Sequence, residues 1–112
     1  MAQMSYRARK HPSYDAAVFH AQQCAEKYLK ARLDEANIDF SRTHDLLVLH
    51  QLVLAAEPDW RSLRTPLAFL NPFAVAYRYP GVAAAKTDAK EAIAYCREVR
   101  GVIRRGLGMR ES

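Results

Sequence analysis

Residues Tyr14–Ala31 read YDAAVFHAQQCAEKYLKA. The apolar residues of this stretch recur every three or four positions, and this spacing continues beyond it. Such spacing is typical of an amphipathic helix, so we expect a long helix from Ser13 to about Asn37. A proline disfavours the helical conformation in the residue before it. Pro12 is therefore expected to stop the helix from extending backwards, with Ser13 as its N-cap.

A second helix is expected from His44 to about Glu57, where leucines and valines leave little of the circumference polar. Ser41 or Thr43 stands before it as the expected N-cap. Because a helix that is apolar nearly all round needs neighbours on most sides, this one belongs in the middle of a packed bundle.

The rest of the chain adds a short helical piece and a last long helix. The short piece contains Trp60 and is broken or restarted by the prolines at positions 66 and 72. A turn at Tyr79–Val82 precedes a helix from about Thr87 to Leu107. No window shows the strict alternation of a half-buried strand. We therefore predict an all-α, up-and-down helical bundle of four or five helices in a single domain, residues 1–112.

Length and composition limit the class of protein. The chain has 112 residues, of which 50% are apolar and 26% charged, as in one folded domain. Its net charge of +5 permits a polyanionic partner. The longest apolar stretch is too short to cross a membrane, and no signal-peptide core follows the N-terminus. A cytoplasmic location is expected, with Cys24 and Cys96 as reduced core thiols rather than a disulfide.

Several common chemistries find no support in the sequence. The four histidines show no spacing typical of a zinc site. Glycine-rich phosphate loops and a serine nucleophile elbow are absent, which argues against nucleotide-triphosphate hydrolysis and acyl transfer by the usual routes. We expect neither a metal nor a cofactor.

The first helix has a polar face opposite its apolar stripe, and that face contains His20, Gln23, Lys27 and Lys30. The plainer interpretation is a solvated surface, with Glu26 and Lys30 as an ordinary ion pair one turn apart. The functional interpretation is a groove wall in which an imidazole and an amide read a base or ribose while lysines attract phosphate.

Two other segments carry groups suited to an anion. The last helix contains six cations: Lys86, Lys90, Arg97, Arg100, Arg104 and Arg105. They form either a phosphate-binding ridge or a charged solvent face. Acidic residues of the same helix offset half of the positive charge, as is common on a solvent face. The Thr43–Asp45 segment before the second helix would either present backbone N–H groups to an anion or serve only as a cap.

Three stretches taken together resemble the HEPN domain, the higher eukaryote and prokaryote nucleotide-binding family: Tyr14–Ala31, the THDL of Thr43–Leu46 and the YRYPG of Tyr77–Gly81. The resemblance covers the chain from Tyr14 to Leu107. It implies a bundle like the one that follows the catalytic domain of kanamycin nucleotidyltransferase, and it implies dimers. It also implies a minimal nucleotidyltransferase partner, for which such domains serve as substrate-binding subunits or as the toxin of a toxin–antitoxin pair.

The chain departs from the family pattern in two places. Family members usually have a full helix before the Tyr-Asp stretch, whereas about a dozen residues precede it here. A shortened N-terminal helix is therefore expected, with self-association or a partner chain covering the gap. Ribonuclease members carry an Arg followed after four to six residues by a His that serves as general acid or base. No His follows Arg78, and no earlier Arg and His have this spacing.

The leading hypothesis is a non-catalytic nucleotide- or RNA-binding accessory domain that works with a nucleotidyltransferase-type partner. Its expected ligand site contains six residues: His20, Gln23, Lys27, His44, Arg78 and Tyr79. Lys27 and Arg78 would hold phosphate, with His44 beside them at a helix N-terminus. His20 and Gln23 would bond to base or sugar, and Tyr79 would stack on a base.

Two alternatives stay open. One is a metal-independent ribonuclease toxin with a non-standard site, in which His20 or His44 acts with Arg78. The other is a structural module that forms a homodimer or higher oligomer and whose polar groove faces a protein.

Overall fold

The computed structural model describes residues 10–73 and 85–108. In these ranges the chain forms four α-helices and one 3-10 helix: α2 (Lys10–Glu35), α3 (Leu46–Val53), η1 (Pro58–Leu63), α4 (Arg64–Leu70) and α6 (Lys86–Gly106). The described ranges contain no strand, which confirms the all-α helical bundle. The expected turn at Tyr79–Val82 and the expected short N-terminal helix fall outside the described residues.

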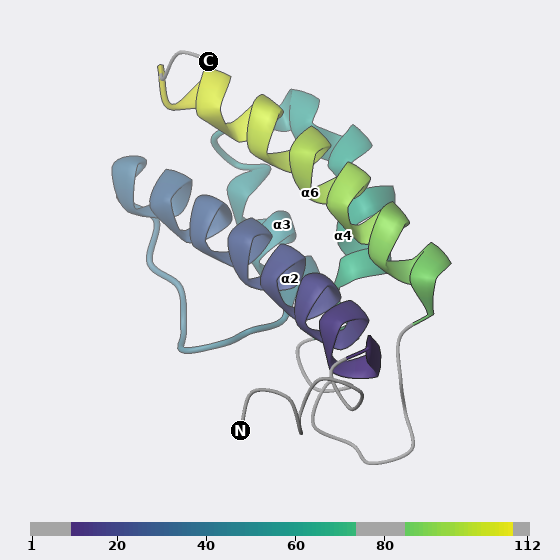
Figure 1. Ribbon diagram of the computed structural model, residues 1–112. Helices are drawn as coiled ribbons and strands as arrows, with labels where there is room; N and C mark the ends of the chain where they lie inside the picture. Colours follow the sequence, from purple (N-terminus) through teal and green to yellow (C-terminus); the bar gives the residue numbers. More distant parts are fainter. Residues whose placement is uncertain (1–9, 74–84, 109–112) are drawn as a thin grey trace.

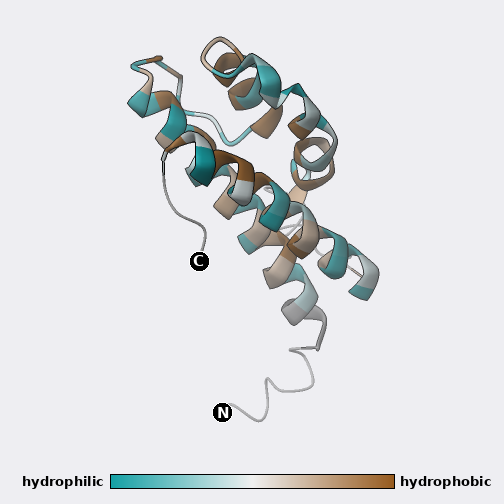
Figure 2. Ribbon diagram, turned by 90° about the horizontal axis from the view of Figure 1, so that it is seen from above, coloured by the Kyte–Doolittle hydropathy of each residue, from teal (hydrophilic) through white to brown (hydrophobic). Residues whose placement is uncertain are grey.

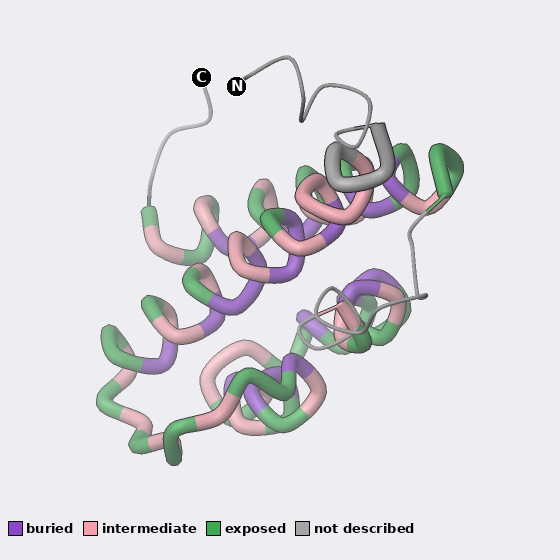
Figure 3. The backbone as a smooth tube through the Cα atoms, turned by 60° about the horizontal axis from the view of Figure 1, so that its bottom comes forward, coloured by how far each residue is buried: buried purple, intermediate pink, exposed green. Residues whose placement is uncertain are grey.

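The helices form two layers. Helices α2 and α6 lie side by side and run in the same direction, and α3 and α4 lie behind them (Figure 1). α3 packs against α2 and α4 packs against α6, so that each long helix covers one short helix. Buried segments recur along the long helices (Figure 3). Hydrophobic and hydrophilic residues alternate with each other along the same helices (Figure 2). The side chains buried between the layers include Val18, Leu29, Leu33, Leu46, Leu49, Leu67, Leu70, Val99 and Ile103.

The ends of α2 show which local signals determine its length. The helix begins at Lys10, so the expectation that Pro12 stops it and Ser13 caps it is wrong. Pro12 lies in the first turn, where backbone N–H groups have no acceptor inside the helix, and a proline there loses no hydrogen bond. At the other end, Asn37 adopts a left-handed φ of 58° and the N–H of Ile38 donates to the Leu33 carbonyl at 2.9 Å. This Schellman arrangement ends the helix.

Helix α3 is shorter than predicted and has a different cap. It spans Leu46–Val53 instead of His44–Glu57, and its N-cap is Asp45 instead of Ser41 or Thr43. The Asp45 carboxylate accepts hydrogen bonds from the N–H groups of residues 47 and 48, at 3.0 and 3.4 Å. Thr43 Oγ1 accepts from the Asp45 N–H at 3.0 Å, which fixes the chain before the helix. A carboxylate two residues later thus displaces the hydroxyl caps that the sequence suggested.

Trp60, in the predicted short helical piece, closes the core between η1 and α6. The side chain is 6% exposed, and its backbone carbonyl oxygen lies 2.8 Å from Nε2 of the buried His50. His50 is therefore a core histidine with a hydrogen-bond partner. A Cβ atom on Gly106 would lie 2.5 Å from Cζ2 of the Trp60 ring. The absence of a side chain at Gly106 is what lets the last turn of α6 approach the indole.

We expect Gly106→Ala to lower the free energy of unfolding by about 1–2 kcal/mol, although alanine is the better helix former. The added methyl group forces the Trp60 ring to shift. In a Trp60→Phe background, which lacks the crowded ring atom, the same change should cost little. Denaturant unfolding of the four variants measures both effects. A cost for Gly106→Ala that is the same in both backgrounds would show that the contact does not matter.

Candidate ligand site between α2 and α6

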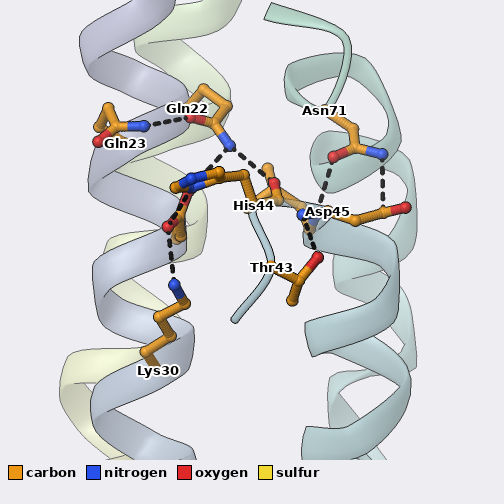
Figure 4. A network of polar contacts seen from close by, with 9 residues as sticks. Gln22, Gln23, Lys30, Thr43, His44, Asp45 and Asn71 are labelled. Atoms are coloured by element: carbon orange, nitrogen blue, oxygen red, sulfur yellow. Dashed lines mark hydrogen bonds and ion pairs between the residues drawn. The ribbon is translucent and has the colours of Figure 1, made fainter. Parts of the chain in front are cut away.

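One flank of α2 carries a buried polar network. Glu26 is only 6% exposed, and its carboxylate contacts Lys30 Nζ at 2.9 Å and His44 Nδ1 at 2.9 Å. Gln22, fully buried, donates to Glu26 Oε1 at 3.3 Å and to the His44 carbonyl oxygen at 3.2 Å (Figure 4). The expectation of an ordinary surface pair between Glu26 and Lys30 is therefore wrong, because the carboxylate is inside the protein.

The same network continues to α4 through Asn71. Its amide oxygen accepts from the Leu46 N–H at 2.8 Å, and its amide nitrogen donates to Asp45 Oδ1 at 3.0 Å (Figure 4). Together with the Asp45 cap, these contacts occupy the N–H groups of residues 46–48. Of the two interpretations of the Thr43–Asp45 segment, the structure supports the cap, since these donors are not open to an anion.

The network sets the ionisation of Glu26. Burial alone would raise the pKa of this carboxyl group, but the hydrogen bonds from Lys30, His44 and Gln22 together outweigh it. The pKa of Glu26 therefore lies below its ordinary value of 4.5. A lowered pKa in the folded state means that the ionised carboxylate stabilises the fold above pH 4.5 and that this contribution is lost as the pH falls through the native pKa.

We expect Glu26→Gln to lower the free energy of unfolding at neutral pH by about 1–3 kcal/mol, because the charge-assisted bonds to Lys30 and His44 are lost. The matched control is Glu91→Gln, which removes the same charge from an exposed position of α6. That change should stay within about 0.5 kcal/mol of wild type. Equal effects of the two substitutions in denaturant unfolding would contradict a structural role for Glu26.

The pH dependence of stability gives a separate test. Wild type should lose stability on acidification below about pH 4.5, as Glu26 takes up its proton. Glu26→Gln has no carboxyl group to titrate, so the difference between the two unfolding free energies should shrink as the pH falls. Unfolding curves measured at several pH values would detect this. A difference that stays constant down to about pH 3 would mean that folding does not lower the pKa of Glu26.

The other flank of α2 borders an open pocket of about 370 Å³ between α2 and α6. It is lined by Ala17, His20, Ala21, Ile93, Cys96, Arg97 and Arg100. The alanines and Ile93 supply apolar surface, and His20, Arg97 and Arg100 supply an imidazole and two guanidinium groups. A pocket with both kinds of surface suits a small ligand that has an apolar ring and a negative charge.

The structure divides the predicted site residues between these two flanks. His20 lines the pocket, and Lys27 is exposed further along the same helix. Gln23 instead donates to the Gln22 side chain at 2.9 Å, and His44 belongs to the Glu26 network with 67% of its side chain exposed. The predicted polar face of α2 therefore does not form one site, because His20 lines the pocket and Gln23 joins the network on the other flank. Arg78 and Tyr79 lie outside the described residues.

The basic row of α6 divides in a similar way. Arg97 and Arg100 line the pocket, whereas Arg104 donates to the Tyr28 hydroxyl at 3.0 Å across the contact of α2 with α6. The sequence showed these arginines as a row but did not place any of them against His20. One signal in the sequence pointed to the pocket. Cys96 and Val99 belong to the apolar stripe of their helix, and Arg97 and Arg100 lie directly beside them.

Within residues 10–73 and 85–108, no three side chains of His, Cys, Asp or Glu come together as a metal site requires. None of the helices in these ranges combines the length and the apolar character needed to cross a membrane.

The fold and the pocket define the class of protein as an all-α bundle with a basic pocket between two parallel helices. The family model of the HEPN domain matches residues 2–106. The chain therefore belongs to the HEPN domain family, which confirms the resemblance of the three sequence stretches. Membership indicates a nucleotide- or RNA-related function. The chain has no significant match among curated proteins or solved structures.

Proposed function

We propose that this HEPN domain is a non-catalytic nucleotide- or RNA-binding accessory domain and that its ligand lies in the α2/α6 pocket. The observation that carries the proposal is the placement of His20 on α2 opposite Arg97 and Arg100 on α6, beside apolar surface. The pocket volume of about 370 Å³ falls within the range of small-molecule sites in proteins.

Each lining group has a role in this proposal. Arg97 and Arg100 bind phosphate oxygens, because guanidinium groups offer paired donors that match a phosphate. His20 bonds to the base or sugar through its ring nitrogens. Ile93 and the two alanines contact the apolar faces of the base or ribose. Lys27 adds positive charge nearby.

The residues of the predicted site outside the pocket take different parts. Gln23 and His44 support the Glu26 network, so in this proposal they hold α2 and the loop in position and do not bind the ligand directly. Arg78 and Tyr79 stay in the proposal as a phosphate ligand and a stacking residue on the strength of the family resemblance alone.

The proposed partner is a nucleotidyltransferase-type protein, including the case of a toxin–antitoxin pair, and the proposed assembly is a homodimer or higher oligomer. The family resemblance supports both. The missing Arg-x4-6-His motif supports a non-catalytic role. Size-exclusion chromatography with light scattering, on the protein alone and after co-expression with a minimal nucleotidyltransferase, tests both the oligomer and the partnership.

We expect Arg97→Gln combined with Arg100→Gln to weaken binding of AMP, GMP and a short single-stranded RNA by about tenfold or more. The matched control is Arg42→Gln with Arg61→Gln, which removes the same charge from exposed positions that do not line the pocket. Calorimetric titration of each variant measures the affinities. Equal weakening by both pairs would mean that the pocket is not the site and that only net charge matters.

Salt dependence distinguishes phosphate binding from the structural alternative. If the pocket neutralises phosphates, the affinity for RNA should fall steeply as salt rises, and the slope should be smaller in the Arg97/Arg100 double variant. A groove that faces only a protein would show no RNA binding at low salt in any variant.

A metal-independent ribonuclease is the second candidate, because the pocket places His20 beside two arginines, the residue types that RNA cleavage by the ribose 2′-hydroxyl uses. Under the leading proposal, RNA incubated with the protein stays intact. Cleavage that leaves cyclic phosphate ends and disappears in His20→Ala would favour the enzyme instead.

A further inference from the structure

Two cysteines lie on the sides of α2 and α6 that face each other. Cys24 lies one turn after His20 and Ala21 on the side of α2 that faces α6, and Cys96 lines the pocket from the opposite helix. Both cysteines are free thiols, and they are half-buried where the sequence suggested core positions. Each thiol changes the pKa of the other, and the two facing helices hold them as neighbours.

The surroundings of this pair are cationic. The positive charges of Arg100 and Lys27 favour the thiolate of Cys24, and those of Arg100 and Arg97 favour the thiolate of Cys96. Positive charge near a thiol favours the thiolate, which is the form that attacks a disulfide. Both cysteines are half-buried rather than enclosed, and Cys96 lines a pocket that is open to solvent.

The two sulfurs have different acidities. The hydrogen bond from Cys96 lowers the pKa of Cys24 to about 7 against the effect of burial, and Arg100 and Lys27 lower it further. The pKa of Cys96 is raised because its hydrogen bond to Cys24, burial and the negative charge of its neighbour all disfavour a second thiolate. Cys24 therefore has the character of an attacking thiolate at neutral pH, and Cys96 that of a thiol that reacts second.

We propose that Cys24 and Cys96 form a dithiol site that small anionic disulfides, such as glutathione disulfide, oxidise to an intramolecular disulfide between α2 and α6. The anionic class follows from the pocket, in which Arg97 and Arg100 attract the carboxylates of such a molecule. The proposal does not depend on nucleotide binding.

The reaction balances without a further reagent. The Cys24 thiolate attacks one sulfur of the small disulfide, so that a mixed disulfide forms, the small S–S bond breaks and one small thiolate leaves. The Cys96 sulfur then attacks the Cys24 sulfur and displaces the second small thiolate. The protein dithiol loses two electrons and the small disulfide gains them, while the two cysteine protons end on the two released thiols.

Intact-mass spectrometry of the whole chain after incubation with glutathione disulfide tests the site. Wild type should lose about 2 Da, the mass of two hydrogens, and retain no adduct. Cys96→Ser should stop at one glutathione adduct on Cys24. Cys24→Ser should form no intramolecular disulfide. In wild type, a limiting amount of iodoacetamide at neutral pH should label Cys24 before Cys96, because Cys24 is the more acidic thiol, and peptide mapping locates the label. Circular dichroism checks that both serine variants fold.

Other outcomes would overturn the pair. A wild-type protein that keeps an adduct and does not resolve it would mean that Cys96 cannot reach the Cys24 sulfur. Labelling of Cys96 before Cys24 in wild type would mean that Cys24 is not the attacking residue.

A comparison of two small disulfides tests the anionic class. For each protein, the rate of oxidation by glutathione disulfide is divided by the rate with the cationic disulfide cystamine. This ratio should be at least about fivefold higher for wild type than for the Arg97→Gln/Arg100→Gln variant. The ratio is the informative quantity, since loss of arginine also changes the thiol and slows both reagents. The Arg42→Gln/Arg61→Gln variant, of equal net charge, should keep the wild-type ratio. A ratio that is unchanged in the pocket variant would overturn the assignment to anionic disulfides.

Discussion

The carboxylate of Glu26 is buried on α2 and contacts groups from its own helix and from the loop before α3. A buried charge without partners is costly, so this residue requires Gln22, Lys30 and His44 to stay where they are. The consequence is a fixed distance and rotation between α2 and the start of α3. Because Asn71 joins the same loop to the end of α4, the polar contacts hold one side of the bundle together where leucine packing alone would allow sliding.

The other side of α2 is held in a different way. There α2 and α6 run parallel, the hydroxyl of Tyr28 accepts a hydrogen bond from Arg104, and small residues of α2 leave room for the pocket. Helices that approach through alanines can place longer side chains at the edge of their contact. His20, the two arginines and the cysteine pair all lie in this part of the structure. The contacts on one flank of α2 thus hold the helix in place, and the residues on its other flank line the pocket.

Much of the fold could be predicted because the two long helices carry regular apolar spacing, which depends only on the chain itself. The errors at Pro12 and Asp45 arose where two local rules compete, and the first turn of a helix tolerates a proline that its interior does not. The burial of Gln22 and Glu26 could not be predicted in this way. Their type suggests solvent, and the contacts that explain why they are inside include His44, which is 22 positions from Gln22 and 18 from Glu26 in the sequence.

The candidate site was harder to predict for a related reason. His20 was found from its position on the helix, but its neighbours Arg97 and Arg100 come from the far end of the chain. Which residues of α6 meet His20 depends on how both helices are rotated about their axes, and no local pattern records that rotation. The same limitation hid the pairing of Cys24 with Cys96.

The opposite flanks of α2 have one more consequence, which concerns insertions and deletions. Each residue added to an α-helix turns everything after it by about 100°. One extra residue just after His20 would carry the Glu26 carboxylate out of its buried position, or else move His20 away from α6, since the two side chains could not both keep their places. The spacing between these two residues is therefore more constrained than the identity of the residues in between, and homologues should vary there by substitution and not by length.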